Sequence, residues 1–180
     1  MKAIVHTPDP ILTAAAKSVS SFDKKLDQLI GNMRETLLAT RNPIGVGLAA
    51  PQIGEPYRIF LTRPREKSKI KVFVNPQIVE HSKNLTDGVP DRENKLEGCL
   101  SIPKVWGRVK RSKTITLAYQ DEQGKKHRES FAGFLATIIQ HETDHINGIL
   151  FTQRVLEQKG KLFQTIKDEE GKEALEEISL

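Results

Sequence analysis

Cysteine is almost absent from this sequence, and so are long apolar segments. Cys99 is the single thiol, so no disulfide can form within the chain. A chain without disulfides suits a reducing compartment, and we expect a cytoplasmic protein. The longest mostly apolar run, residues 131–139, has nine residues, whereas a membrane-spanning helix needs about 20. The first residues also lack the apolar segment and the small-residue cleavage site of a secretory signal.

The sequence also lacks a strong excess of charge of one sign. Its 28 Lys and Arg residues and 23 Asp and Glu residues give a net charge of +5, and the basic residues are scattered. This pattern does not indicate sequence-specific binding of nucleic acid. With 37% hydrophobic and 28% charged residues, the 180-residue chain has a globular composition. Its length favours one domain that spans residues 1–180.

The spacing of apolar residues predicts most of the secondary structure. Asp23 is placed to cap a helix over residues 24–40, in which large apolar residues recur every three or four positions. A second helix is predicted to end at Gly148, and a third, interrupted at Gly171, is predicted over residues 154–180. Strands are expected over residues 57–62, 70–74, 105–109, 114–119 and 126–131, with a short one at 149–151. Asn75 and Pro76 either end the second of these strands or start a short continuation through residues 77–79.

The most informative stretch is the sequence Q-H-E-T-D-H at residues 140–145. Positions four apart lie on one face of a helix, so His141 and His145 can reach the same metal ion. Glu142 follows the first histidine directly, where its carboxylate can act as a base toward a water molecule on that metal. The simplest alternative is a helix that contains two histidines by chance, and the specificity of the pattern argues against it.

A catalytic metal ion of this kind needs a third protein ligand. No histidine follows His145, which excludes the metzincin pattern, and a downstream glutamate of the thermolysin kind fits poorly. Cys99 is the strongest remaining candidate, because one Cys and two His form a known set for Zn²⁺ or Fe²⁺ and leave a position open to water. Asp144 lies inside the motif and is a candidate to support the site, with Arg111 as its expected ionic partner.

Three stretches together resemble one enzyme family. The sequences G-V-G-L-A-A-P-Q at residues 45–52, E-G-C-L-S at 97–101 and Q-H-E-T-D-H at 140–145 are similar to the three signature motifs of peptide deformylases, in the same order. The similarity extends over nearly the whole chain. It implies an α+β fold, with mostly antiparallel or mixed β-sheets around a central metal-binding helix and a further helix at the C-terminus. It also implies metal-dependent removal of the formyl group, as formate, from the N-terminal formylmethionine of nascent proteins.

The resemblance implies a role for each residue of the metal centre. Cys99, His141 and His145 would bind one divalent metal ion per chain. The physiological metal of the family is Fe²⁺, which is often replaced by Zn²⁺, Ni²⁺ or Co²⁺. Glu142 would take a proton from the attacking water and return it to the leaving amine, as a general base and then a general acid.

The same resemblance implies the substrate contacts. The side-chain amide of Gln52 and the backbone N–H of Leu100 would stabilise the developing negative charge on the formyl oxygen. The peptide backbone would pair as an added strand with the glycine-rich loop, and the methionine side chain would occupy an apolar pocket beside the histidine-bearing helix. The residues expected to contact the substrate are Val46, Gly47, Glu97, Gly98, Phe134, Thr137 and Ile138. A contact with the ribosome through the C-terminal helix is a further expectation.

Three features differ from the family pattern and bear on peptide preference. Trp106 stands where many relatives have an arginine near the mouth of the site, and Thr137 makes the pocket wall more polar. The polar segment at residues 81–95, expected to be a solvated loop, is longer than in short family members. Two other functions fit the metal motif alone, namely a zinc endopeptidase and a metal-stabilised binding module on the ribosome. Cys99 and the glycine-rich loop argue against the endopeptidase.

Overall fold

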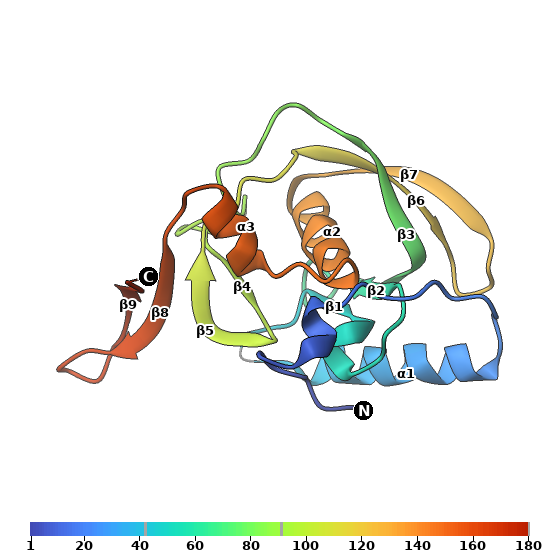
Figure 1. The fold of residues 1–180 in the computed structure, drawn as a ribbon, viewed down its shortest axis with the longest axis horizontal. Coiled ribbons are helices and arrows are strands. Elements are labelled where there is room, and N and C mark those ends of the chain that lie inside the picture. Colours follow the sequence, from blue (N-terminus) through green and yellow to red (C-terminus); the bar gives the residue numbers. More distant parts are fainter. Residues whose placement is uncertain (42, 91, 180) are drawn as a thin grey trace.

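A computed structural model describes residues 1–41, 43–90 and 92–179 of the chain (Figure 1). These residues form two separate antiparallel sheets, with one helix central to the molecule. The larger sheet has the spatial order β1 (Gly47–Ala49), β2 (Ile59–Thr62), β3 (Lys71–His81), β6 (Thr114–Gln120) and β7 (Lys126–Ala132). The smaller sheet has the order β4 (Glu97–Cys99), β5 (Ile102–Gly107), β8 (Leu162–Lys167) and β9 (Glu173–Glu177).

The larger sheet is covered by a helix on each face, which explains why strand β2 is buried on both of its faces. Side chains along β2 alternate, so Ile59 and Leu61 pack with helix α1 (Lys24–Ala39), whereas Phe60 packs with helix α2 (Gly133–Ile146). All four residues of β2 are buried as a result. This arrangement confirms the expected α+β architecture around a central helix, and it fixes α2 against the sheet.

Helix α1 begins and ends as its sequence predicts. The Asp23 side chain accepts hydrogen bonds from the backbone N–H groups of Lys25 and Leu26, which caps the first turn. Its apolar face, which includes Ile30 and Met33, is almost completely buried. The predicted strands are also present, and β3 has the continuation that was one of the two alternatives, because it runs through Asn75 and Pro76 to His81.

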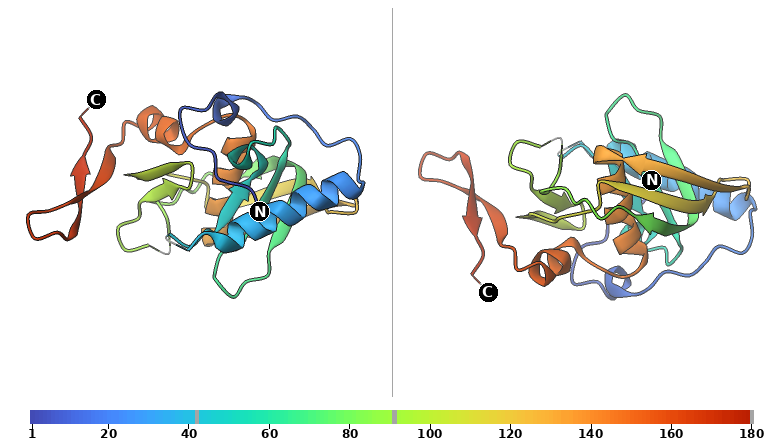
Figure 2. Two further views of the ribbon diagram at one scale, coloured as in Figure 1. Left: turned by 90° about the horizontal axis from the view of Figure 1, so that it is seen from below. Right: turned by 90° about the horizontal axis from the view of Figure 1, so that it is seen from above.

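The predicted C-terminal helix over residues 154–180 is wrong. Helix α3 covers only Phe151–Glu157, and the chain then forms the hairpin β8–β9, which extends away from the body of the molecule (Figure 2). Aromatic and β-branched residues in β8 favour a strand, and Gly171 adopts a positive φ of 79° in the turn of the hairpin. The short strand expected at residues 149–151 is also wrong, because Phe151 begins α3.

The loop at residues 81–95 is less solvated than its composition indicates. Thr86 and Val89 are buried, and Thr86 donates its backbone N–H to the carbonyl oxygen of Arg111. The prediction of a solvated loop is therefore wrong for Thr86 and Val89. Among the described residues, no helix is both long and apolar enough to span a membrane.

Candidate metal centre

The three predicted metal ligands come from two elements that the fold brings together. Cys99 is the last residue of β4, whereas His141 and His145 lie one turn apart on α2. One side-chain donor atom from each of the three residues lies within 4.8 Å of the others. The Cys99 Sγ and the His145 Nε2 are 3.1 Å apart, and the two imidazole rings lie edge to face. The structure therefore assembles the Cys, His, His set that the sequence predicts.

The protonation of this cluster fits a metal ligand set. Burial alone would raise the pKa of the Cys99 thiol, but the adjacent His145 and His141 lower it to about 5, which favours the thiolate that binds metals. The Nδ1 of His145 and the Oε2 of Glu142 are buried without a hydrogen-bond partner among the described residues. A soft thiolate and two imidazoles, in reach of one point and beside a free carboxylate oxygen, suit a divalent transition metal.

Glu97 fixes the orientation of the first histidine. The Nδ1 of His141 donates to the Glu97 Oε1 at 2.6 Å, which leaves Nε2 as the ring nitrogen available to a metal. Arg111 donates to both oxygens of the same carboxylate, at 2.7 and 2.9 Å. Burial alone would raise the pKa of Glu97, but Arg111 and His141 hold it far below the usual range. The Glu97 charge in turn raises the pKa of His141 in spite of burial.

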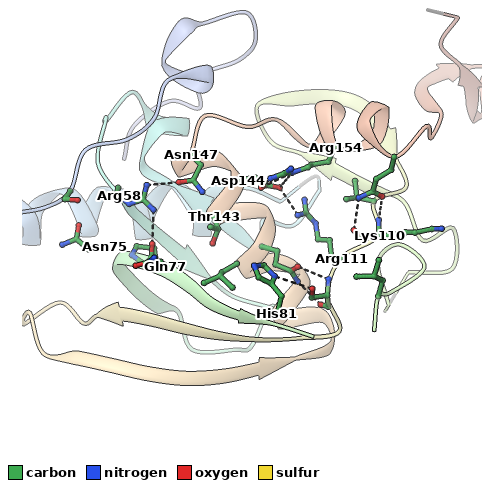
Figure 3. A pocket seen from close by; sticks show the side chains of 18 residues that line it. Arg58, Asn75, Gln77, His81, Lys110, Arg111, Thr143, Asp144, Asn147 and Arg154 are labelled. Carbon is green, nitrogen blue, oxygen red and sulfur yellow. Dashed lines mark hydrogen bonds and ion pairs between the residues drawn. The ribbon is translucent and has the colours of Figure 1, made fainter. Parts of the chain in front are cut away.

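Asp144 on α2 continues this ionic network with Arg111 and Arg154 (Figure 3). The Asp144 carboxylate accepts from the Nη1 of Arg111 at 2.9 Å, which confirms the predicted pair. It also accepts from the Nη2 of Arg154 in α3 at 2.8 Å. Asp144 and both arginines line a polar cavity of about 760 Å³ that contains none of the metal ligands. The network therefore ties α3, α2 and β4 together behind the metal centre.

The sequence reasoning missed the positioning role of Glu97 and the participation of Arg154. The family resemblance implies that Glu97 contacts the substrate, yet its two carboxylate oxygens accept hydrogen bonds from Arg111 and His141. The sequence does contain a signal for the positioning role of Glu97. Glu97 and Cys99 are two positions apart in a strand, so their side chains lie on the same face. Arg154 gives no such signal, because its contact with Asp144 depends on the turn before α3.

Glu142 lies against the glycine-rich strand β1. A side-chain carbon at Gly47 would come within 2.2 Å of the Glu142 Oε1, so the carboxylate fits only because residue 47 has no side chain. Glu142 is 3% exposed, and burial raises the pKa of its carboxyl group to about 7. A carboxyl group with a pKa near neutrality can both accept and return a proton.

The Gln52 side chain is held at both ends of its amide. Its Oε1 accepts from the backbone N–H of Ala49 at 2.9 Å, which braces the short helix at residues 50–53. Its Nε2 donates to the Oγ of Ser101 at 3.2 Å and lies 3.5 Å from the Cys99 Sγ. The amide therefore stabilises the loop and also directs its N–H groups toward the metal centre.

A cavity of about 720 Å³ opens beside the metal ligands. Its wall on α2 is formed by Phe134, Thr137 and Ile138, which share one helix face with His141. The opposite walls come from the glycine-rich loop and from β4 and β5. All the residues expected to contact the substrate line this cavity, namely Val46, Gly47, Glu97, Gly98, Phe134, Thr137 and Ile138, and so do Gln52 and Leu100.

Comparison with known proteins agrees with this site. The family model for polypeptide deformylase matches residues 1–161. A peptide deformylase of Christiangramia forsetii is 40% identical over 177 residues, which cover 90% of this chain and 85% of that protein. The chain belongs to the polypeptide deformylase family. Members of this family are metal-dependent hydrolases that remove the N-terminal formyl group from nascent polypeptides.

Solved peptide deformylase structures share the fold. The enzyme of Thermotoga maritima aligns with a TM-score of 0.76 at 36% identity, and covers 86% of this chain and 97% of that chain. A class I type b peptide deformylase from Acinetobacter baumannii, in crystals with Met-Ala-Ser bound, aligns with a TM-score of 0.75 at 36% identity. That alignment covers 86% of this chain and 98% of the solved chain. The fold class and the family function predicted from the sequence motifs are thus confirmed.

Proposed function

We propose that this chain removes the formyl group from formyl-Met peptides at the Cys99, His141 and His145 cluster, within one catalytic domain over residues 1–180. The observation that carries the assignment is the convergence of these three donors beside the buried carboxylate of Glu142. A divalent metal ion held there would polarise the formyl carbonyl and lower the pKa of the attacking water. We propose Fe²⁺ as the resident metal, with Zn²⁺, Ni²⁺ or Co²⁺ as replacements, because one thiolate and two imidazoles are acceptable donors for each.

Glu142 moves the proton in this proposal. Its Oε2 has no partner among the described residues and can accept a hydrogen bond from the attacking water. The carboxylate takes the proton as the water attacks the formyl carbon, and the resulting carboxylic acid gives it to the amine that leaves. Residue 47 has no side chain, which leaves room for the carboxylate beside β1.

Gln52 and Leu100 stabilise the charge that develops on the formyl oxygen. The Gln52 Nε2 already lies on the cavity side of the loop, beside Cys99, and its position is fixed by the bond from Ala49 to its Oε1. The backbone N–H of Leu100, the residue after Cys99, is the second proposed donor. Donors that are fixed before the reaction stabilise an oxyanion without reorganisation, which is the most effective way to lower the barrier.

The peptide lies between the glycine-rich loop and β4. Its backbone pairs with residues 46–47, and its methionine side chain enters the pocket formed by Phe134, Thr137 and Ile138. The Met-Ala-Ser peptide bound to the Acinetobacter baumannii relative supports a peptide with free methionine as the product. We assign Glu97 to the orientation of His141 instead of to peptide contact. The expected contact with the ribosome through a C-terminal helix is not part of this proposal, because residues 162–167 and 173–177 form strands.

The assay that tests this proposal measures two products from one sample. Protein purified without oxygen is incubated with formyl-Met-Ala-Ser, and formate and cleaved internal peptide are both quantified. Metal content is determined on the same sample. We expect formate release in proportion to bound metal and no internal cleavage. Internal cleavage without formate would assign the site to an endopeptidase instead.

A further inference from the structure

The family match ends at residue 161, yet the chain after this point contributes to the active-site cavity. Strand β8 pairs with β5, with Trp106 opposite Phe163 and Val105 opposite Gln164. Thr165 in β8 and Glu173 in β9 line the same cavity as the metal ligands. Figure 1 shows the hairpin beside β5, at the end of the smaller sheet. The hairpin is therefore one wall of the cavity and not only an extension from it.

Trp106 is held in this wall by three contacts. Its Nε1 donates to the Oγ1 of Thr165 at 2.8 Å. Its ring lies so close to Gly98 that a side-chain carbon there would come within 2.6 Å of the ring. The guanidinium group of Arg92 lies 5.7 Å from the ring centre, within the range of a cation–π contact. The indole is thus fixed in one orientation, and its accessible surface forms part of the cavity lining.

The Trp106 indole lies near the metal ligands but on a different wall of the cavity from the methionine pocket. Gly98, against which it packs, directly precedes the metal ligand Cys99. The pocket for the methionine side chain lies on another wall, formed by α2. A peptide whose formyl group reaches the metal ligands and whose methionine side chain lies against α2 has its next residue beyond the metal centre. Strand β5 and the hairpin form a further wall of the cavity, and Trp106 is the large aromatic side chain on that wall.

We propose that Trp106, positioned by Thr165 of the C-terminal hairpin, forms a subsite for a flat apolar or aromatic side chain at the residue that follows formylmethionine. This subsite presupposes that the cavity binds formyl-Met peptides. A rigid aromatic surface loses little conformational entropy on binding and stacks favourably on another ring. In this proposal Thr165 acts through Trp106. It is a positioning residue, because its hydroxyl group fixes the rotation of the indole.

Kinetics on two peptides test the subsite. The peptides are formyl-Met-Phe-Ser and formyl-Met-Gly-Ser, and the measured quantity is the ratio of their kcat/KM values. Thr165→Val keeps the volume of the side chain but removes the acceptor for the indole N–H. We expect it to lower the Phe-to-Gly ratio by about 3- to 10-fold, the size of a single aromatic contact, through KM for the Phe peptide. Thr165→Ser keeps the hydroxyl group and should restore the ratio.

A matched control comes from the larger sheet. Thr116 in β6 also uses its hydroxyl group in hydrogen bonds, to Glu80 at 2.6 Å and Ser130 at 3.1 Å, and does not line the cavity. Thr116→Val should leave the Phe-to-Gly ratio unchanged. An unchanged ratio in Thr165→Val as well would overturn the proposed subsite. Absence of formate release from both peptides in the unmodified protein would instead overturn the proposed function, so the two failures can be told apart.

Fluorescence gives a second test that does not depend on turnover. Trp106 is the single tryptophan of the chain, so all indole emission comes from the proposed subsite. Titration of the metal-loaded protein with the product peptide Met-Phe-Ser should shift and quench this emission, and Met-Gly-Ser should change it much less. Thr165→Val should raise the Kd of Met-Phe-Ser by about 3- to 10-fold. Equal spectral changes with both peptides would contradict stacking on Trp106.

Discussion

The metal centre and the C-terminal hairpin are built in opposite ways. The metal centre lies where α2 meets β4, and Glu142, Asp144 and His145 there are all buried. The hairpin β8–β9 extends from the same small sheet, and most of its side chains are partly or fully exposed. A buried site requires particular residues at each position, whereas an exposed hairpin tolerates many sequences. Chemistry is therefore fixed in the first region, and peptide preference is free to vary in the second.

Removal of the thiolate should have the largest effect. Cys99→Ala takes away one of three protein ligands and leaves only two imidazoles for the metal ion. We expect loss of most bound metal and of nearly all formate release. Elemental analysis and the deformylation assay on the same preparation measure both quantities. Full metal occupancy in this variant would mean that Cys99 is not a ligand.

Glu142→Gln separates chemistry from metal binding within the buried region. The amide keeps the size of the side chain but cannot accept a proton from water. General acid–base catalysis contributes about 10²–10⁴ in rate, so kcat should fall by at least that range while metal content stays near that of the unmodified protein. Glu157→Gln, at an exposed position of α3, is a control of the same chemistry and should change neither quantity. Near-normal turnover of Glu142→Gln would exclude the proposed role.

Gln52→Leu tests the oxyanion donor. Loss of one such donor costs about 2.7–4 kcal/mol of transition-state stabilisation, so kcat should fall by about 10²–10³, with a smaller change in KM. The Gln52 Oε1 also braces the backbone of Ala49, and a purely structural role would lower the melting temperature while kcat stays nearly intact. Steady-state kinetics and a thermal melt of the same variant distinguish the two roles.

The smallest expected effect is on the free energy of unfolding, and it differs between the two ends of the hairpin. Leu162, at its base, is 6% exposed and packs with Phe151 and Val155, whereas Leu175 in β9 is 44% exposed. Leu162→Ala should lower the free energy of unfolding by about 2–5 kcal/mol, and Leu175→Ala should change it by less than about 0.5 kcal/mol. Urea denaturation of both variants measures the difference. Equal losses would mean that the exposed strand β9 is as firmly packed as the base of the hairpin.

The same contrast explains which features the sequence could predict. His141 and His145 follow the helical period, and the chemistry of a metal site then selects Cys99 as the third ligand. The amphipathic spacing and the Asp23 cap of α1 are local signals as well, and they predict that helix correctly. Asp144 could be paired with Arg111 because a buried carboxylate in a metal motif needs a cationic partner.

The hairpin could not be predicted in the same way. Strand β8 exists because it pairs with β5, more than 50 residues earlier in the chain, as between Trp106 and Phe163. Charged residues on both sides of Gly171 resemble an exposed helix when no strand partner is known. Two hydrogen bonds depend on long-range contacts of the same kind. Arg154 donates to Asp144, and Arg111 donates to Glu97. Local periodicity carries no information on such contacts.

The central claim is that Cys99, His141 and His145 hold one metal ion. The most direct test is X-ray diffraction from crystals of the active, metal-loaded protein, with data collected on both sides of the absorption edge of the metal found by elemental analysis. We expect a single anomalous peak in contact with the Cys99 Sγ and with one ring nitrogen of each histidine. A peak elsewhere in the molecule, or an active crystal without a peak between these three side chains, would contradict the account.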